Sequence, residues 1–261
     1  MIRAFWSEWL KLRRPAMLFG GVGSIVGFAV LAIFLTLRRL GSVGGPGGSA
    51  LTALQVNASD GFAQLMANSA TFIGVVALAL FAIAVGTEYG NGTLRNLLVR
   101  QPSRLRLLAG KMLALASFVA IAAILAFAAA LVTALLLAPG YGISISAWFT
   151  HDGMRSLLST IGNLLISTVA WGAIGAVLAL MLRSTATAIA VGLAYALVVE
   201  NLLSLTVSGS KQWLPGQLID AIARGGASSV SYVSALLLVG LYLIGAAGIA
   251  GTVFRYRDVA S

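Results

Sequence analysis

Ionisable side chains are scarce in this sequence, and many of them lie in one basic segment, Glu88 to Met112. The segment carries five of the 17 Lys and Arg residues, which are Arg95, Arg100, Arg104, Arg106 and Lys111. Clustered cations of this kind bind anionic lipid headgroups, nucleic acid or a partner protein. The choice among these depends on the elements on either side of the segment.

Several residue types that active sites need are missing. The sequence has no cysteine and one histidine, so it offers no disulfide, thiol nucleophile or thiolate metal site. We expect His151, beside Asp152, to be a surface residue rather than a metal ligand. The phosphate-binding motif G-x-x-x-x-G-K-[ST] is also absent, because Met112 follows the pair Gly110 and Lys111. We therefore expect a protein that is not an enzyme and that holds no cofactor or metal of its own.

Composition indicates an integral membrane protein. The chain is 59% hydrophobic and 9% charged, with a mean hydropathy of +0.99, and a helix of about 20 apolar residues spans the hydrocarbon core. We predict an all-α fold with one transmembrane domain over residues 1–261. Its six spans are expected at about 16–37, 70–86, 113–138, 157–182, 186–207 and 230–254. The second has the shortest apolar core, which Gly61 to Ser69 would lengthen, with Phe62, Leu65 and Met66 on one face.

Charge bias predicts the orientation, because Lys and Arg beside spans are retained in the cytoplasm. An N-terminus inside leaves five of the 17 Lys and Arg residues outside, which are Arg38, Arg39, Arg155, Lys211 and Arg224. We predict a multi-pass protein of the cell (plasma or inner) membrane with both termini cytoplasmic, although Arg38 and Arg39 oppose this assignment. Most of the net charge of +10 then lies beside lipid headgroups, and we expect no nucleic-acid partner.

Two amphipathic segments flank the predicted spans. Residues 1–15 are predicted to form an interfacial helix with one apolar face, formed by Ile2, Phe5, Trp6, Trp9 and Leu10. Arg3, Ser7, Lys11 and Arg14 lie on the other face, and Arg13 is an exception on the apolar one. After the second span, Asn91, Gly92 and Thr93 are expected to start a short helix that Pro102 ends, before Ser103 caps the next helix. This arrangement predicts a rigid cytoplasmic elbow that passes force from a partner; a basic loop lying on lipid is the simpler alternative.

The order of residues in this elbow resembles the loop between the second and third spans in permease subunits of type-2 ATP-binding-cassette (ABC) transporters. The shared elements are Glu88, then Gly92, Thr93, Leu94 and Arg95, then Pro102, Ser103 and Arg104, then Gly110 and Lys111. The N-terminal "SEWLKLRRP" resembles the Glu-x-x-Lys-x-x-Arg pattern before the first span of such subunits, here Glu8, Lys11 and Arg14. The two resemblances and the six predicted spans cover nearly the whole chain.

The resemblance implies a permease subunit that pairs with a second copy or a related permease. Separate ATPase subunits with bound ATP and Mg would drive alternating access, and the cargo would be an exported amphipathic or lipid-like compound, drug or peptide. Coupling to the ATPase would involve Glu88, Gly92, Thr93, Leu94, Arg95, Leu98, Arg100, Pro102 and Arg104. Glu88 and Arg95 lead this set, although Glu88 would alternatively pair with Arg95 or Arg104. The competing hypotheses are a membrane sensor or scaffold, and an ion-coupled carrier, which would need ionisable residues in several spans.

Polar residues within the predicted spans are candidates for a pathway or gate. Glu200 must face protein or water, because a carboxylate facing lipid is strongly penalised. It would bind or gate a substrate, or bond structurally to Asn201 or the outer-loop backbone. Asn163 is expected to form interhelical hydrogen bonds or to contact substrate. The stretch after Glu200 resembles the re-entrant outer segment of the family, in which Trp213, Leu214, Leu218, Ile219 and Ile222 would bury; an ordinary surface helix is the alternative.

Small residues four positions apart permit close approach of helices. Such pairs are Gly20 with Ser24, Gly23 with Gly27, and Ala247 with Gly251. We expect these pairs to pack within the subunit; a seam between two subunits is the alternative.

Overall fold

The computed structural model describes residues 2–40, 51–90 and 104–256, which are helical almost throughout. Six of its helices are long and apolar enough to span a membrane. They are Pro15–Arg38, Gly61–Glu88, Arg106–Tyr141, His151–Leu182, Thr185–Thr206 and Tyr232–Ile249. The predicted all-α membrane fold with six spans is confirmed.

The first span is approached through a break in the helix. Helix α1 (Ile2–Leu12) ends before Arg14, whose backbone is extended with ψ of 142° because Pro15 follows it. The chain then continues through α2 (Pro15–Met17), a π-helical turn η1 (Leu18–Val22) and α3 (Gly23–Arg38). The break allows α1 to pack against α7 instead of continuing the span.

The middle helices are longer than their apolar cores. Helix α5 (Gly61–Gly90) follows the short α4 (Ala53–Val56) and begins at Gly61 rather than near residue 70. Helix α7 (Arg104–Leu137) begins directly after Ser103, the predicted cap, and α8 (His151–Leu182) begins before the predicted residue 157. The predicted α5 extension is held because Phe62, Leu65 and Met66 are buried. A count of consecutive apolar residues misses the polar first turns of α8.

The second half of the chain is more irregular. The fifth span consists of α9 (Thr185–Ala194), a π-helical turn η4 (Tyr195–Val199) and α10 (Glu200–Thr206). A short helix, α11 (Pro215–Ala223), then packs against α8 and against the last helix, α12 (Tyr232–Tyr256). The connections contain three short 3-10 turns, η2 (Ala138–Tyr141), η3 (Ser146–Phe149) and η5 (Ser210–Gln212).

The core is centred on α5 and α8, which form the most extensive helix pair. Glycine permits their close approach, since a Cβ on Gly175 would lie 2.1 Å from the carbonyl oxygen of Leu78. The expectation that glycines of the first span pack within the subunit is wrong. A Cβ on Gly20, Gly23 or Gly27 would meet nothing within 4 Å.

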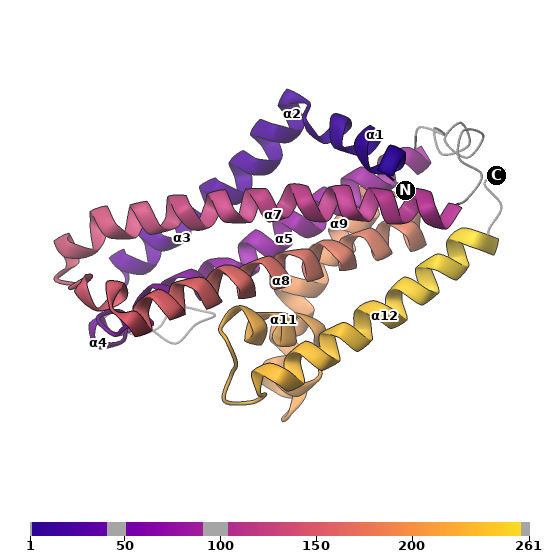
Figure 1. Cartoon of the computed structure of the whole chain (residues 1–261). Helices are drawn as coiled ribbons and strands as arrows, with labels where there is room; N and C mark the ends of the chain where they lie inside the picture. Colours follow the sequence, from indigo (N-terminus) through magenta and orange to yellow (C-terminus); the bar gives the residue numbers. More distant parts are fainter. Residues whose placement is uncertain (1, 41–50, 91–103, 257–261) are drawn as a thin grey trace.

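Different elements meet at the two ends of the bundle (Figure 1). At one end lie α1, the end of α5, the start of α7, the turn after α8 and the end of α12; we call it the elbow end. At the other lie α4 and the connection from α7 to α8, and we call it the loop end. Trp148 closes the loop end, where it is fully buried and donates a hydrogen bond of 2.9 Å to the carbonyl oxygen of Val56.

Candidate functional site

Four charged side chains from three helices meet at the elbow end, and we call them the charge cluster: Glu8 and Lys11 of α1, Glu88 of α5 and Lys111 of α7. The Lys111 Nζ lies 2.8 Å from Glu8 Oε2 and 2.6 Å from Glu88 Oε1. The Lys11 Nζ lies 3.1 Å from Glu88 Oε1 and also bonds to Glu8. Each carboxylate therefore contacts both ammonium groups, and the cluster has no net charge.

The four side chains of the charge cluster differ in how far they are buried. The side chains of Glu8 and Lys111 are each 6% exposed and that of Glu88 is 12% exposed, whereas that of Lys11 is 42% exposed. An ion pair removed from water must be well compensated, and loss of one partner leaves an uncompensated buried charge. Lys111 is the most critical member, because it is buried and bridges two carboxylates on different helices.

The pKa shifts of the cluster follow from its geometry. Burial alone would raise the pKa of Glu8, but the charge of Lys111 and hydrogen bonds from Lys11 and Lys111 outweigh it and lower that pKa below 4.5. Burial alone would lower the pKa of Lys11, but its hydrogen bond to Glu8 and the charge of Glu88 raise that pKa above 10.5. Both groups are therefore charged across the physiological pH range.

Helix α1 positions Glu8 for the cluster, because Glu8 lies on the buried side of this helix. Ala4, Glu8 and Leu12 recur every four residues, so they lie on one side of the helix, and all are buried. Trp6, with Ile2 and Leu10, is exposed on another side, while Trp9 is half-buried and stacks on Phe5. Arg14 is exposed after the helix ends. The predicted apolar face is therefore split, and Glu8 and Lys11 take part in tertiary contacts that the amphipathic pattern did not predict.

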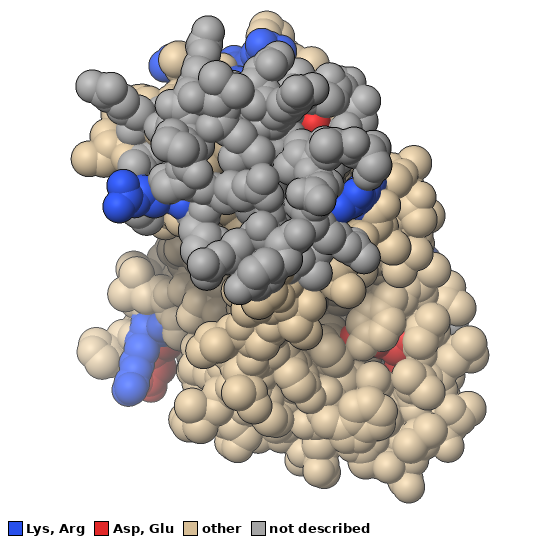
Figure 2. Space-filling view, turned by 90° about the vertical axis from the view of Figure 1, so that its right-hand side faces the viewer, with Lys and Arg blue, Asp and Glu red and all other residues tan. Residues whose placement is uncertain are grey.

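The structure gives Glu88 two partners that the sequence did not predict, Lys11 and Lys111. Gly92, Thr93, Leu94, Arg95, Leu98, Arg100 and Pro102, and the side chain of Arg104, lie outside the described residues. Figure 2 looks onto the elbow end and shows a few separate groups of Lys and Arg side chains near the edges of the view. The cluster thus joins α1 to the residues immediately before and after the predicted elbow.

The other candidate residues lie toward the loop end. Glu200 is 2% exposed, and its Oε1 accepts a hydrogen bond of 2.7 Å from the N–H of Gly216 in α11. Asn163 of α8 accepts a hydrogen bond of 2.8 Å from the Tyr232 hydroxyl of α12. The exposed Asn201 bonds only within its own helix, to the carbonyl oxygen of Leu197 at 2.9 Å. Glu200 and Asn163 therefore both link separate helices.

The predicted re-entrant segment is partly buried. Leu214, Leu218, Ile219 and Ile222 are buried, as expected for a helix packed into the bundle. The Trp213 side chain is exposed, which contradicts its expected burial. Its carbonyl oxygen instead accepts a hydrogen bond of 2.9 Å from the Tyr242 hydroxyl.

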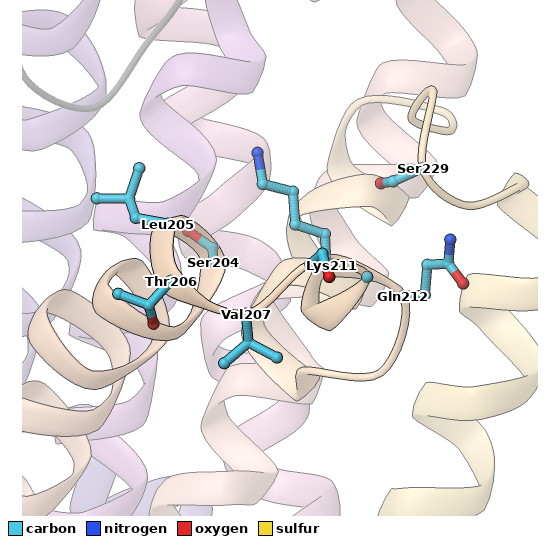
Figure 3. Close-up of a pocket in the computed structure, with 9 residues that line it drawn as sticks. Ser204, Leu205, Thr206, Val207, Lys211, Gln212 and Ser229 are labelled. Carbon is cyan, nitrogen blue, oxygen red and sulfur yellow. The ribbon is translucent and has the colours of Figure 1, made fainter.

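A hollow of about 370 Å³ lies past the end of α10. Figure 3 shows Lys211 extending between the end of α10 and Ser229, with Gln212 directed to the other side. Lys211 is the charged residue that lines the hollow, and most of the others present hydroxyl or aliphatic groups. The lining residues are Ser204, Leu205, Thr206, Val207, Ser208, Gly209, Lys211, Gln212 and Ser229. Elsewhere at the loop end, His151 and Asp152 are almost fully exposed, as expected of surface residues.

Comparison with known proteins gave a family match. A family model described as "ABC-2 family transporter protein" matches residues 4–199, a range that contains the whole charge cluster and ends immediately before Glu200. A search of curated proteins found no match. The match covers most of the 261 residues and agrees with the six spanning helices. The chain therefore belongs to the ABC-2 family of transporter proteins, as a membrane-spanning permease component.

Proposed function

We propose that this chain is the permease subunit of an ATP-driven exporter of an amphipathic or lipid-like compound, such as a drug or peptide. It pairs with a second copy or a related permease in the cell membrane. Both termini and the elbow end face the cytoplasm, where separate ABC ATPase subunits bind ATP and Mg. Family membership supports the permease role, and the positive charge of the elbow segment supports this orientation.

The charge cluster is the observation that supports coupling through the elbow. Glu88 lies at the start of the elbow segment and Lys111 lies near its end, and both bond to residues of α1. A displacement of the elbow would therefore move α1, α5 and α7 as one unit, because separating buried ions is costly. Closure of the ATPase pair on ATP would supply the displacement, since a ligand shifts a conformational equilibrium by its differential affinity for the two states.

Purification of the chain from its native membrane tests this proposal. We expect an ABC ATPase subunit to copurify and to hydrolyse ATP. Glu88→Gln and Arg95→Ala should lower hydrolysis, because the first weakens the charge cluster and the second alters the predicted contact between the elbow and the ATPase. Asp152→Asn, which neutralises an exposed carboxylate at the loop end, is the matched control and should leave hydrolysis unchanged.

The result of this purification separates the transporter from its main competitor. A sensor or scaffold whose basic elbow binds only lipid would copurify no ATPase. Normal hydrolysis in both elbow variants would remove Glu88 and Arg95 from coupling and leave the permease assignment to the family match alone.

A further inference from the structure

Glu200 is turned toward protein by an irregularity in the fifth span. The π-helical turn Tyr195–Val199 directly precedes it, and a π turn inserts one extra residue and so changes the face on which later residues lie. Val198, Val199 and Leu202 around it are exposed, whereas Glu200 is buried. The carboxylate is therefore directed into the bundle from a helix that is otherwise largely exposed.

The partner of Glu200 is the first turn of α11. Pro215 is the first residue of this helix and has no N–H, so Gly216 supplies the first one, which Glu200 Oε1 accepts at 2.7 Å. A negative charge at this position also interacts favourably with the helix dipole. A Cβ on Gly216 would lie 2.2 Å from Glu200 Oε2 and 2.8 Å from the Trp171 ring, so the contact requires glycine.

Two turns separate helix α11 from the helices before and after it. Left-handed glycines flank it, Gly209 with φ of 78° before it and Gly225 with φ of 75° after it. Besides its buried apolar face, two further bonds hold the segment. The Thr71 hydroxyl of α5 donates to Asp220 Oδ1 at 3.1 Å, and the Tyr242 hydroxyl donates to the carbonyl oxygen of Trp213.

We propose that Glu200 is a positioning residue that, with Gly216, forms a latch holding α11 in the bundle, and that release of this latch opens the bundle beside α11. The opening rests on the proposed transport function, whereas the latch is a property of the chain alone. Both residues lie beyond the range that the family model matches.

Cysteine labelling measures the latch, because the chain contains no cysteine of its own. Ala221→Cys places a thiol on the buried face of α11, where the native residue is 2% exposed. The full-length chain in lipid nanodiscs is treated with a polar maleimide, and the labelling rate reports how often α11 leaves the bundle. In this background Glu200→Ala and Gly216→Ala should each label about tenfold faster or more, the effect expected for loss of a hydrogen bond to a charged group.

Two further variants sharpen the measurement. Asn201→Ala changes the adjacent exposed residue, which has no bond to α11, and should label at the parent rate. Glu200→Gln keeps an oxygen that accepts the Gly216 N–H and should label more slowly than Glu200→Ala. If Glu200→Ala does not fold, as judged by circular dichroism, Gly216→Ala decides the question.

Parent-rate labelling in folded Gly216→Ala and Glu200→Ala would overturn the latch. The measurement needs no ATPase subunit or substrate, so its failure is distinct from a failure of the proposed function. Accelerated labelling in a chain that copurifies no ATPase would keep the latch and reject its role in transport.

Discussion

The two ends of this protein hold buried carboxylates in different ways. At the elbow end, Glu8 and Glu88 each bond to Lys11 and Lys111, so charge is balanced by opposite charge. Toward the loop end, Glu200 is bound by the backbone N–H of Gly216 at the start of a helix. The first arrangement depends on equal numbers of charges, and the second depends on close approach between a side chain and a backbone.

This difference predicts that the two sites respond differently to loss of a charge and to an added methyl group. Removing one charge at the elbow end leaves an uncompensated buried ion, whereas an uncharged acceptor can still serve at position 200. Adding one methyl group at Gly216 blocks the loop-end contact and has no counterpart in the charge cluster. Variants of the two regions therefore separate the two kinds of stabilisation.

Lys111→Met should have the largest effect. It leaves two buried carboxylates facing the half-exposed Lys11, and loss of one partner of a buried ion pair costs about 3–5 kcal/mol of unfolding free energy. Denaturant unfolding of the purified chain measures this loss. The double variant Glu8→Gln with Lys111→Met has a neutral cluster again and should be more stable than Lys111→Met alone; the opposite order would contradict charge balance.

Gly216→Ala should come next. Its Cβ would overlap Glu200 and Trp171, and overpacking a well-packed site costs roughly 1–3 kcal/mol of unfolding free energy. Gly27→Ala is the matched control, because a Cβ there meets nothing and alanine favours the helix. Thermal unfolding of the two variants should show a lower midpoint for the first and an unchanged or higher one for the second. Equal midpoints would remove the requirement for glycine at position 216.

Stability should also depend on pH through the charge cluster. The pKa of Glu8 is lowered by folding, so its stabilisation is present above pH 4.5 and is lost as pH falls through the lowered pKa. The pKa of Lys11 is raised by folding, so its stabilisation is present below pH 10.5 and is lost as pH rises through the raised pKa. Glu8→Gln should flatten the acid limb of the stability profile. An acid limb identical to that of the parent would place the titrating group elsewhere.

Lys11→Met should have the smallest effect. The Lys11 side chain is 42% exposed, and exposed ion pairs contribute about 0.2–1 kcal/mol. Its unfolding free energy, measured beside that of Lys111→Met, compares the same chemical change at two degrees of burial. A loss as large as that of Lys111→Met would show that burial does not set the strength of this cluster.

The sequence predicted the features that depend on local composition. Long apolar runs predicted the six spans, and the penalty for a carboxylate facing lipid predicted that Glu200 faces protein or water. The extension of α5 over Gly61 to Ser69 and the start of α7 after Ser103 were also predicted, whereas the polar first turns of α8 were missed, because helix formation there depends on tertiary packing rather than on hydropathy. Gly20, Gly23 and Gly27 of the first span were assigned to internal packing by spacing alone, although a Cβ on any of them would meet nothing within 4 Å.

The charge cluster was not predicted as a unit, for a physical reason. Its bonds join residues 77 and 103 positions apart, and no local periodicity specifies which distant lysine meets which glutamate. A usable signal was present, since Glu8, Lys11, Glu88 and Lys111 all belong to the motifs of the resembling family. Their opposite charges at the ends of adjacent helices would have suggested pairing.

One measurement joins the two regions and tests the central claim, that motion of an ATPase partner reaches the permease through the elbow and its charge cluster. The assembled complex carries Ala221→Cys in α11, and its labelling rate is compared with and without ATP and vanadate, which trap the ATPase subunits. We predict that trapping changes the rate in the parent, and that Glu8→Gln with Lys111→Met abolishes this change while hydrolysis continues. The account would be contradicted if trapping changed the labelling rate in the double variant as much as in the parent, or if it left the rate in the parent unchanged.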